Sequence, residues 1–361
     1  MVKILGLDIG GANTKHALIN AQDKEIGLLS AGSDYFPIWK DVQSFPEYLE
    51  NLRNKLVEKF GVIDQVVFVT TAELADCFQT KKEGIETICG FVEKCFYGES
   101  EGNPPLILDV YGQFIPSQNA SENWLEVAAT NWVASALYLA AKHQNAVIID
   151  IGSTTTDFIP IHQGKVVAQG KNDLERLISK ELVYSGLIRT NVAAIVYEIK
   201  IRNEIVPVAS ELFATIGDVY LLLGLISDEE FIGETADNKP VTKENAKIRL
   251  ARIICSDTNQ LTHNDIMDIA RQIKDKQFEK LSDAMNHVLN RYREMYEINP
   301  EIVLIGSGAN TIGMSLLRMN GIYEQHLADD ILDERSLNSF CAFAVAVLFS
   351  NRFSKIEGNI E

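Results

Sequence analysis

The sequence predicts an α/β protein of two similar lobes, and two observations carry that prediction. First, residues 5–19 and 147–161 share one pattern: an apolar strand ending in aspartate, a glycine-containing polar turn and a returning apolar strand. The two stretches align without a gap, so that Asp8 falls on Asp150, Gly10 on Gly152, Thr14 on Thr156 and Lys15 on Asp157. Second, strands and helices alternate after each hairpin, which is typical of a mixed sheet flanked by helices.

The first lobe is expected over residues 1–144. Apolar and β-branched runs predict its strands at 3–8, 14–20, 25–31, 65–70, 104–110 and 112–116. Apolar residues with helical spacing predict helices at 41–60, 84–96 and 122–143. A polar loop fills the interval between the strand at 65–70 and the helix at 84–96.

The second lobe is expected over residues 145–336, with a helical insertion at about 191–296. After the second hairpin we expect a strand at 164–170, a helix at 172–184 and an extended stretch at 191–211. Further helices are predicted at 212–226, 242–256 and 263–296, the last of them broken near Lys274. A strand at 301–305 precedes a glycine turn, and a small-residue helix at 337–353 returns to the first lobe.

Composition narrows the class of protein. The chain has 361 residues, of which 46% are hydrophobic and 23% charged, so each lobe can bury a core. A net charge of −17 argues against nucleic acid or an anionic membrane as a partner. The five cysteines show no metal-binding spacing and suit a reducing compartment. With no leader and no membrane-length apolar run recognised, we expect a cytoplasmic protein acting on small molecules.

The hairpin turns have the chemistry of a phosphate site. Hydroxyl side chains and backbone N–H groups in such turns hold phosphate oxygens, and carboxylates at the turn suit Mg²⁺. The residues expected to bind phosphate are Gly10, Gly11, Asn13, Thr14 and Lys15 of the first hairpin and Gly152, Ser153, Thr154 and Thr155 of the second. The expected metal ligands are Asp8, Asp150 and Asp157. Aspartates that merely cap turns and a solvated Lys15 are the alternatives.

A second pair of carboxylates follows the strand at 65–70. Glu73 and Asp76 are three residues apart just past a strand end, where residues of an active site gather in α/β folds. If the loop has begun to coil, the two side chains share a face and raise one another's pKa, which favours a general base. Glu73 is the first choice for that base, and capping of the next helix is the alternative.

Five features resemble the acetate/sugar kinase, Hsp70 and actin superfamily: the two hairpins, the helix at 122–143, the strand with Gly306-Ser-Gly308, and the terminal helix. The resemblance implies two ribonuclease-H-like lobes, an actin-like ATPase duplication, with a cleft between them. In that superfamily the hairpins grip nucleotide phosphates and Mg²⁺, and the late glycine turn faces the adenosine.

A narrower resemblance concerns function. Segments 70–78, 150–157, 181–190 and 211–220, with Asn131-Trp132, are similar to the hydantoinase/oxoprolinase-like family of one-carbon pathway proteins. A characterised member joins the phenol oxygen of γ-glutamyltyramine to an aminomethyl-furanmethyl diphosphate, releasing diphosphate, in methanofuran biosynthesis. The resemblance therefore implies a Mg²⁺-dependent transferase. The expected substrate-binding residues are Asn131, Trp132, Arg189, Gly306, Ser307 and Gly308.

Two other functions stay open at this point. The hairpins fit an ATP-dependent kinase or ATPase equally well, in which case ATP or ADP is the ligand. A non-catalytic nucleotide-sensing or filament protein is the third interpretation, although polar clusters at strand ends argue against a scaffold. Arg189 as a structural ion pair, Asn131 and Trp132 as core residues, and the glycines as ordinary turn residues are the corresponding alternatives. The sequence makes no prediction of oligomeric state.

Overall fold

The computed structural model describes residues 2–22, 25–97, 103–327 and 339–357. The chain divides into two compact units. Unit 1 comprises residues 1–145, 161–176 and 329–361, and unit 2 comprises 146–160 and 177–328. The division at 145/146 lies one residue from the expected lobe boundary, and residues 161–176 group with unit 1. Residues 336–338, where the second lobe was expected to end and the terminal helix to begin, lie outside the described residues.

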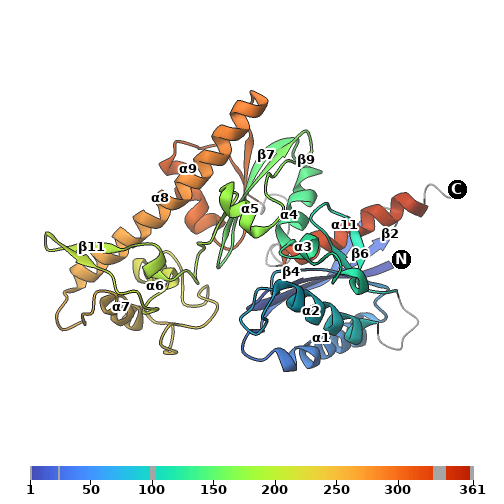
Figure 1. The fold of residues 1–361 in the computed structure, drawn as a ribbon, viewed down its shortest axis with the longest axis horizontal. Coiled ribbons are helices and arrows are strands. Elements are labelled where there is room, and N and C mark those ends of the chain that lie inside the picture. The colour runs from blue at the N-terminus through green and yellow to red at the C-terminus, as the bar shows by residue number, and fades with distance from the viewer. Residues whose placement is uncertain (1, 23–24, 98–102, 328–338, 358–361) are drawn as a thin grey trace. The chain divides into compact units, whose positions relative to one another are not determined.

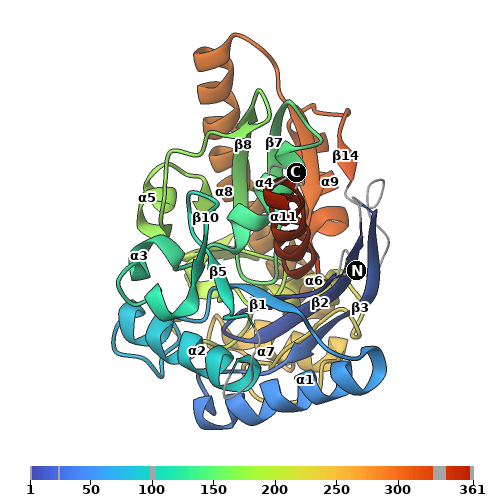
Figure 2. The same cartoon turned by 90° about the vertical axis from the view of Figure 1, so that its right-hand side faces the viewer.

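The sheet of unit 1 has the strand order β3-β2-β1-β4-β5-β6. Its strands are β1 (Val2–Ile9), β2 (Asn13–Gln22), β3 (Glu25–Tyr35), β4 (Gln65–Thr70), β5 (Leu106–Leu108) and β6 (Phe114–Pro116). The first three form an antiparallel meander, and β4 runs parallel to β1 (Figure 2). The short chain reversal between β1 and β2 therefore lies at the end of a fully paired strand.

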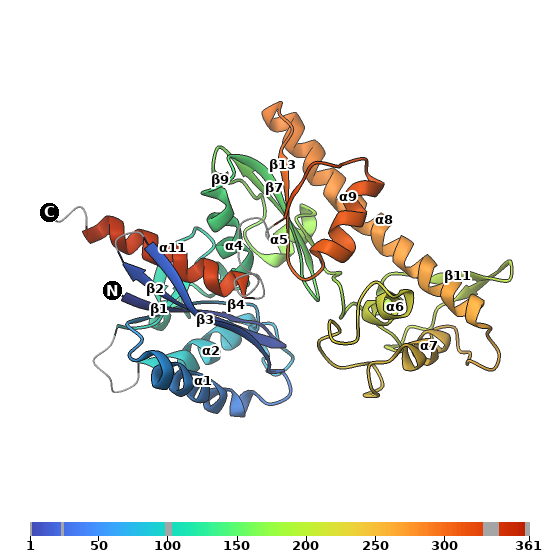
Figure 3. The same ribbon diagram turned by 180° about the vertical axis from the view of Figure 1, so that it is seen from behind.

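Helices cover both faces of this sheet. One face packs α1 (Phe45–Phe60) and α2 (Lys81–Phe96) on alternate residues of β1, including Leu5 and Leu7 (Figures 1 and 3). The opposite face carries α4 (Asn131–Ala140) and α11 (Phe340–Glu357). A side chain at Gly6 would collide with the Ala342 carbonyl oxygen, so only glycine lets α11 lie this close to β1.

The helix predicted at 122–143 is wrong as a continuous element. It is split into α3 (Trp124–Val127) and α4, and Ala129 between them has φ 51°. Two anchors impose the break: Ala128 forms a parallel bridge with Thr70, and the Thr130 hydroxyl donates to the Leu108 carbonyl at 2.9 Å. Sheet pairing has therefore overridden helix propensity here.

The second sheet has the order β10-β8-β7-β13-β14, with β9 beside β8. Its strands are β7 (Asn145–Ile151), β8 (Thr156–His162), β9 (Lys165–Val166), β10 (Leu182–Val183), β13 (Glu301–Ile305) and β14 (His326–Leu327). The expected strand at 164–170 is only the two residues of β9. The expected helix at 172–184 stops early: α5 (Asp173–Ile178) ends before Lys180, whose φ of 57° turns the chain into β10. Pairing of β10 with β8 supplies the physical reason.

The insertion in unit 2 combines helices with a β-hairpin. Its elements are η3 (Val192–Ala194), β11 (Glu198–Ile201), β12 (Glu204–Pro207), α6 (Ile216–Leu223), α7 (Lys243–Arg252) and α8 (His263–Tyr296). Helix α8 is unbroken, contrary to the expected interruption near Lys274 (Figure 1). The buried stripe runs through that point by way of Ile273, Gln277 and Phe278, so core packing holds the helix straight.

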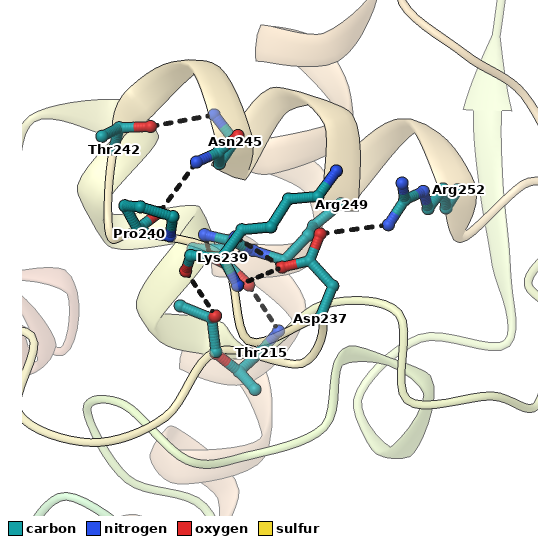
Figure 4. A network of polar contacts seen from close by, with 10 residues as sticks. Thr215, Asp237, Lys239, Pro240, Thr242, Asn245, Arg249 and Arg252 are labelled. Atoms are coloured by element: carbon teal, nitrogen blue, oxygen red, sulfur yellow. Dashed lines mark hydrogen bonds and ion pairs between the residues drawn. The ribbon is translucent and has the colours of Figure 1, made fainter.

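A buried ion network joins α6 to α7. Asp218 caps the start of α6 by accepting a hydrogen bond from the Thr215 N–H at 3.0 Å. The same carboxylate pairs with Arg249 of α7 at 2.6 Å, and neither side chain is exposed. Asp237 lies between Arg249 and Arg252, at 3.1 Å from each (Figure 4). Because both charges of the central pair are desolvated, each depends on the other.

Candidate functional site

The two hairpin turns have the same geometry. The Gly10 N–H donates to the Asn13 carbonyl at 2.9 Å, and the Gly152 N–H donates to the Thr155 carbonyl at 2.9 Å. Gly10 and Gly152, and Asn13 and Thr155, are the pairs that the ungapped alignment of the sequence superimposes. The predicted duplication of a hairpin is therefore confirmed at the level of backbone hydrogen bonds.

A downstream segment braces each turn in an equivalent way. The Ile38 N–H donates to the Gly11 carbonyl at 2.9 Å in unit 1. At the equivalent position of unit 2, the N–H groups of Ile188 and Arg189 donate to the Ser153 carbonyl at 3.0 and 2.9 Å. These bonds occupy carbonyl oxygens, which are the groups of a turn that repel an anion. Bracing thus favours a turn that receives phosphate oxygens through its N–H and hydroxyl groups.

Asp8 and Lys15 pair across the first hairpin. They are register partners on β1 and β2, and the Lys15 ammonium lies 3.5 Å from the Asp8 carboxylate. Asp8 is 5% exposed, and burial raises the pKa of its carboxyl, a rise that the Lys15 charge opposes. Beside them Thr14 is fully buried, and among the described residues its hydroxyl has no hydrogen-bond partner.

The second hairpin presents two carboxylates. Asp150 at the end of β7 and Asp157 on β8 are both half-buried. Thr156, which follows the turn and precedes Asp157, is buried. Its hydroxyl donates a hydrogen bond to the Ser185 carbonyl at 2.8 Å. The hydroxyl residues Ser153, Thr154 and Thr155 are half-buried in the turn. The arrangement offers hard oxygen donors next to phosphate-binding groups.

The glycine turn after β13 lies against this hairpin within unit 2. The Gly308 N–H donates to the Ile151 carbonyl at 2.8 Å. A Cβ at Gly306 would collide with the Asp150 carboxylate and lie 2.5 Å from the Ile151 carbonyl oxygen. Ser307 between the two glycines is exposed. The turn therefore fixes the side-chain position of Asp150, a role that the sequence did not reveal.

We expect Gly306→Ala to impair the Asp150 site strongly. Gly306 has φ 87°, a conformation that alanine adopts at a cost of about 1–2 kcal/mol, and the added methyl group displaces Asp150. Turnover should fall at least tenfold, and unfolding in urea should shift by more than the strain energy, because the methyl group also meets the Ile151 backbone. Gly321→Ala is the matched control, because Gly321 has φ 72° and open space around it. Equal turnover losses in the two variants would contradict the contact.

Arg189 is anchored beside the second turn by its own backbone and is exposed. The buried residue Gln277 of α8 contacts the segment that carries Arg189. The Gln277 amide nitrogen donates to the Ser185 hydroxyl at 2.9 Å and to the Gly186 carbonyl at 2.8 Å. No sequence pattern singled out Gln277. Its position as an uncharged polar residue within the apolar stripe of α8 could have indicated a buried hydrogen-bonding role.

Glu73 is enclosed in unit 1 and is 1% exposed. It lies in the turn after β4, and the backbone N–H groups of Glu73 itself and of Ala129 lower the pKa of its carboxyl. Among the described residues, the second oxygen, Oε2, has no hydrogen-bond partner. Burial is the main cause that raises the Glu73 pKa to about 7; Lys81 lowers it and Asp173 raises it.

The expected rise of the Glu73 pKa through a nearby Asp76 carboxylate is wrong. Asp76 is exposed, and it is not among the groups that shift the Glu73 pKa. The loop does not coil there, since α2 begins only at Lys81. Desolvation, and not a neighbouring carboxylate on the same helix face, brings Glu73 close to neutral pH.

The expected substrate residues of α4 have internal partners. Trp132 is 3% exposed, and the guanidinium of the buried Arg176 lies 4.0 Å from its ring centre. The Asn131 side chain accepts a hydrogen bond from the Trp132 N–H at 2.8 Å. Lys81 and Asp173 form a further ion pair at 3.0 Å in the same unit. Trp132 is therefore packed against Arg176, and Asn131 satisfies a backbone N–H in the first turn of α4.

Within the described ranges, no helix has the length and apolarity needed to cross a bilayer. The same residues contain no group of three or more His, Cys, Asp or Glu side chains arranged to hold a metal ion.

Comparisons with known proteins agree with the expected family and fold. The chain is 34% identical over 98% of its length, and over 99% of the relative, to the (4-{4-[2-(gamma-L-glutamylamino)ethyl]phenoxymethyl}furan-2-yl)methanamine synthase of Methanocaldococcus jannaschii. A synthase of the same name from Methanococcus vannielii is 37% identical over 165 residues, which are 46% of this chain and 72% of that protein.

Among solved structures, the nucleotide-free acetone carboxylase, from work on ATP-dependent acetone carboxylation, has a TM-score of 0.58 at 12% identity. The match covers 96% of this chain and 70% of that one. It confirms the predicted α/β fold. The family model described as hydantoinase/oxoprolinase matches residues 64–347, and the chain belongs to that family.

Proposed function

We propose that the protein is a transferase of methanofuran biosynthesis. It joins the phenol oxygen of γ-glutamyltyramine to the methylene carbon of an aminomethyl-furanmethyl diphosphate, and diphosphate leaves. The observation that carries the proposal is the end-to-end similarity to a synthase whose name describes a phenoxymethyl-furan product. The duplicated hairpins support it, because a reaction with a diphosphate leaving group needs phosphate-binding turns.

Unit 2 supplies groups for the leaving diphosphate. As the C–O bond breaks, negative charge grows on the diphosphate oxygens, and donors oriented in advance lower the barrier most effectively. The hydroxyls of Ser153, Thr154 and Thr155 and the exposed Arg189 beside them are such donors. Arg189 offers a planar fork that matches a phosphate group. Gln277 keeps this segment in place from the core.

Mg²⁺ fits the second hairpin. Asp150 and Asp157 are hard oxygen ligands, and two carboxylates with waters and phosphate oxygens complete the coordination that this ion prefers. Gly306 leaves the space that the Asp150 carboxylate occupies. When bound, the ion would neutralise charge on the leaving diphosphate.

Unit 1 supplies a base for the acceptor. A phenol has an unperturbed pKa of about 10, so its oxygen becomes a good nucleophile only as its proton is removed. Glu73, with a pKa raised to about 7 and one oxygen without a partner among the described residues, suits that role at neutral pH. The backbone N–H groups of Glu73 and Ala129 lower this pKa by less than burial raises it.

The test is incubation of the purified protein with both substrates and Mg²⁺, with product mass and diphosphate release as readouts. We expect one ether formed per diphosphate released and no dependence on ATP. Asp150→Ala should lower turnover by about 10²–10³-fold, the effect of losing one preorganised electrostatic element. ATP consumption with no ether formed would replace this proposal with the kinase or ATPase interpretation.

A further inference from the structure

A cavity of about 270 Å³ lies within unit 1, between the strands β2 and β3 and the helix α1. Among the described residues, none that lines it belongs to the hairpin turns or to the turn that holds Glu73. Its volume is just below the range usual for ligand pockets, so it suits a molecule smaller than a nucleotide.

The strand wall of this cavity is polar, although a sheet face beneath a helix is normally apolar. His16 of β2 and Ser30 and Asp34 of β3 line it. Gly32, the register partner of His16, lies between those two residues of β3, and a Cβ there would come within 2.7 Å of the His16 ring. Glycine therefore leaves room for the imidazole, and no large apolar side chain of these three β3 positions fills the space beneath α1.

His16 is buried with part of its hydrogen-bonding capacity unused. The residue is 9% exposed, and its Nε2 lies 3.4 Å from the Ser30 hydroxyl oxygen. Among the described residues, its Nδ1 has no hydrogen-bond partner. Buried polar atoms are nearly always paired with protein, water or a ligand, so the strand wall is built for a polar occupant.

The helix wall places two like charges at the same cavity. Lys55 and Lys59 are one turn apart on α1, and both are exposed and line the cavity. The Lys59 ammonium lies 5.1 Å from the centre of the Phe60 ring, and neither lysine forms an ion pair with a described residue. Like charges four residues apart on a helix repel each other, and an anion between them removes that repulsion.

The one carboxylate of the cavity lies away from these lysines. Asp34 accepts a hydrogen bond from the Tyr48 hydroxyl at 2.9 Å and forms no ion pair with a described residue. Lys55 follows Tyr48 by seven residues, which is about 10 Å along α1. The buried side chains of Leu52 and Leu56 line the cavity from the helix between and beside them. The cavity is therefore acidic at one end, basic at the other and apolar along one wall.

We propose that this cavity is a second small-molecule site, and that it takes an elongated zwitterion. The carboxylate of the ligand binds Lys55 and Lys59, and its amine binds Asp34. The aliphatic chain between the two charges packs on Leu52 and Leu56. The inference is independent of the proposed function, because the cavity shares no residue with the groups assigned to that reaction.

The experiment titrates the full chain, labelled at the leucine methyl groups, with 6-aminohexanoate and follows the methyl NMR signals. The signals of Leu52 and Leu56, assigned with Leu52→Val and Leu56→Val, should shift in a saturable way. Hexanoate lacks the amine and hexylamine lacks the carboxylate, so each should bind at least tenfold more weakly. Absence of binding, shifts that leave Leu52 and Leu56 unchanged, or equal affinity for hexanoate would overturn the inference.

Variants assign the two ends of the ligand. The double variant Lys55→Met with Lys59→Met should weaken binding of 6-aminohexanoate by at least tenfold, because charged hydrogen bonds are lost. Lys94→Met is the matched control, since Lys94 is an exposed lysine in the last turn of α2 that does not line the cavity. Asp34→Asn should abolish the preference for 6-aminohexanoate over hexanoate. Wild-type affinity in the double lysine variant, with circular dichroism showing a folded protein, would place the binding elsewhere and overturn the inference.

Discussion

Glu73→Gln is expected to lower turnover by about 10²–10⁴-fold, the range for loss of a general base. Glutamine has nearly the shape of glutamate and keeps a carbonyl acceptor, so the turn is preserved while proton transfer is lost. Diphosphate affinity should stay near the wild-type value, because Glu73 lies in the turn after β4 and outside both hairpins.

The pH dependence of this enzyme should follow from the same residue. The base acts when deprotonated, so kcat/KM should rise with pH up to about 7, the raised pKa of Glu73, and level off above it. The free energy of unfolding, in contrast, should fall as the pH rises. The raised pKa imposes no penalty below about pH 4.5, and the penalty grows to about 3 kcal/mol as pH passes 7. Steady-state rates and urea unfolding at several pH values measure the two effects.

Asp76→Asn is the control for Glu73→Gln. Asp76 is the other carboxylate of the same loop, and it is exposed. Its variant should keep the acid limb of the pH profile and most of the turnover. An acid limb that persists unchanged in Glu73→Gln would assign the base elsewhere.

Arg249→Met is expected to destabilise unit 2 by about 3–5 kcal/mol, because it leaves the Asp218 carboxylate buried without its counter-charge. Burial already raises the Asp218 pKa, and the bond from Arg249 opposes that rise. Loss of the arginine therefore pushes Asp218 toward its neutral form and loosens the cap of α6. Urea unfolding followed by circular dichroism measures the change.

Two further variants separate charge from packing in this network. Arg252→Met removes the partly exposed arginine that also contacts Asp237, and should cost no more than about 1 kcal/mol. Adding Asp218→Asn to Arg249→Met removes both buried charges, keeps an oxygen that accepts from the Thr215 N–H, and should recover part of the lost stability. A double variant less stable than Arg249→Met alone would show that the pair is not the source of the effect.

The sequence predicted those parts of the molecule in which local pattern and tertiary structure agree. Strand 301–305 coincides with β13 and strand 65–70 with β4, since both are short apolar runs bounded by turn residues. The two hairpin turns could be predicted because the same sequence pattern occurs twice. The predictions failed where a distant segment decides the local conformation, as at Ala129 and Lys180, two non-glycine residues with positive φ next to sheet pairing.

The residues of the candidate site could be predicted from the sequence, but their surroundings could not. Residue types and spacing identified the hairpins and Glu73, but the environment of each side chain depends on contacts far away in the sequence. The raised pKa of Glu73 comes from enclosure, and the fixed position of Asp150 comes from Gly306. Gln277 and the Arg176–Trp132 stack join segments that no local pattern connects.

The close approach of α11 to Gly6 has a consequence for synthesis of the chain on the ribosome. Unit 2 is contained within residues 146–328, whereas unit 1 is completed only by α11, about 330 residues after Gly6. At translation speeds of about 5–20 residues per second, β1 waits roughly 20–70 s for the helix that covers it. The first segment made is thus among the last to reach its final packing, so the nascent chain carries an uncovered apolar sheet face that chaperones can recognise.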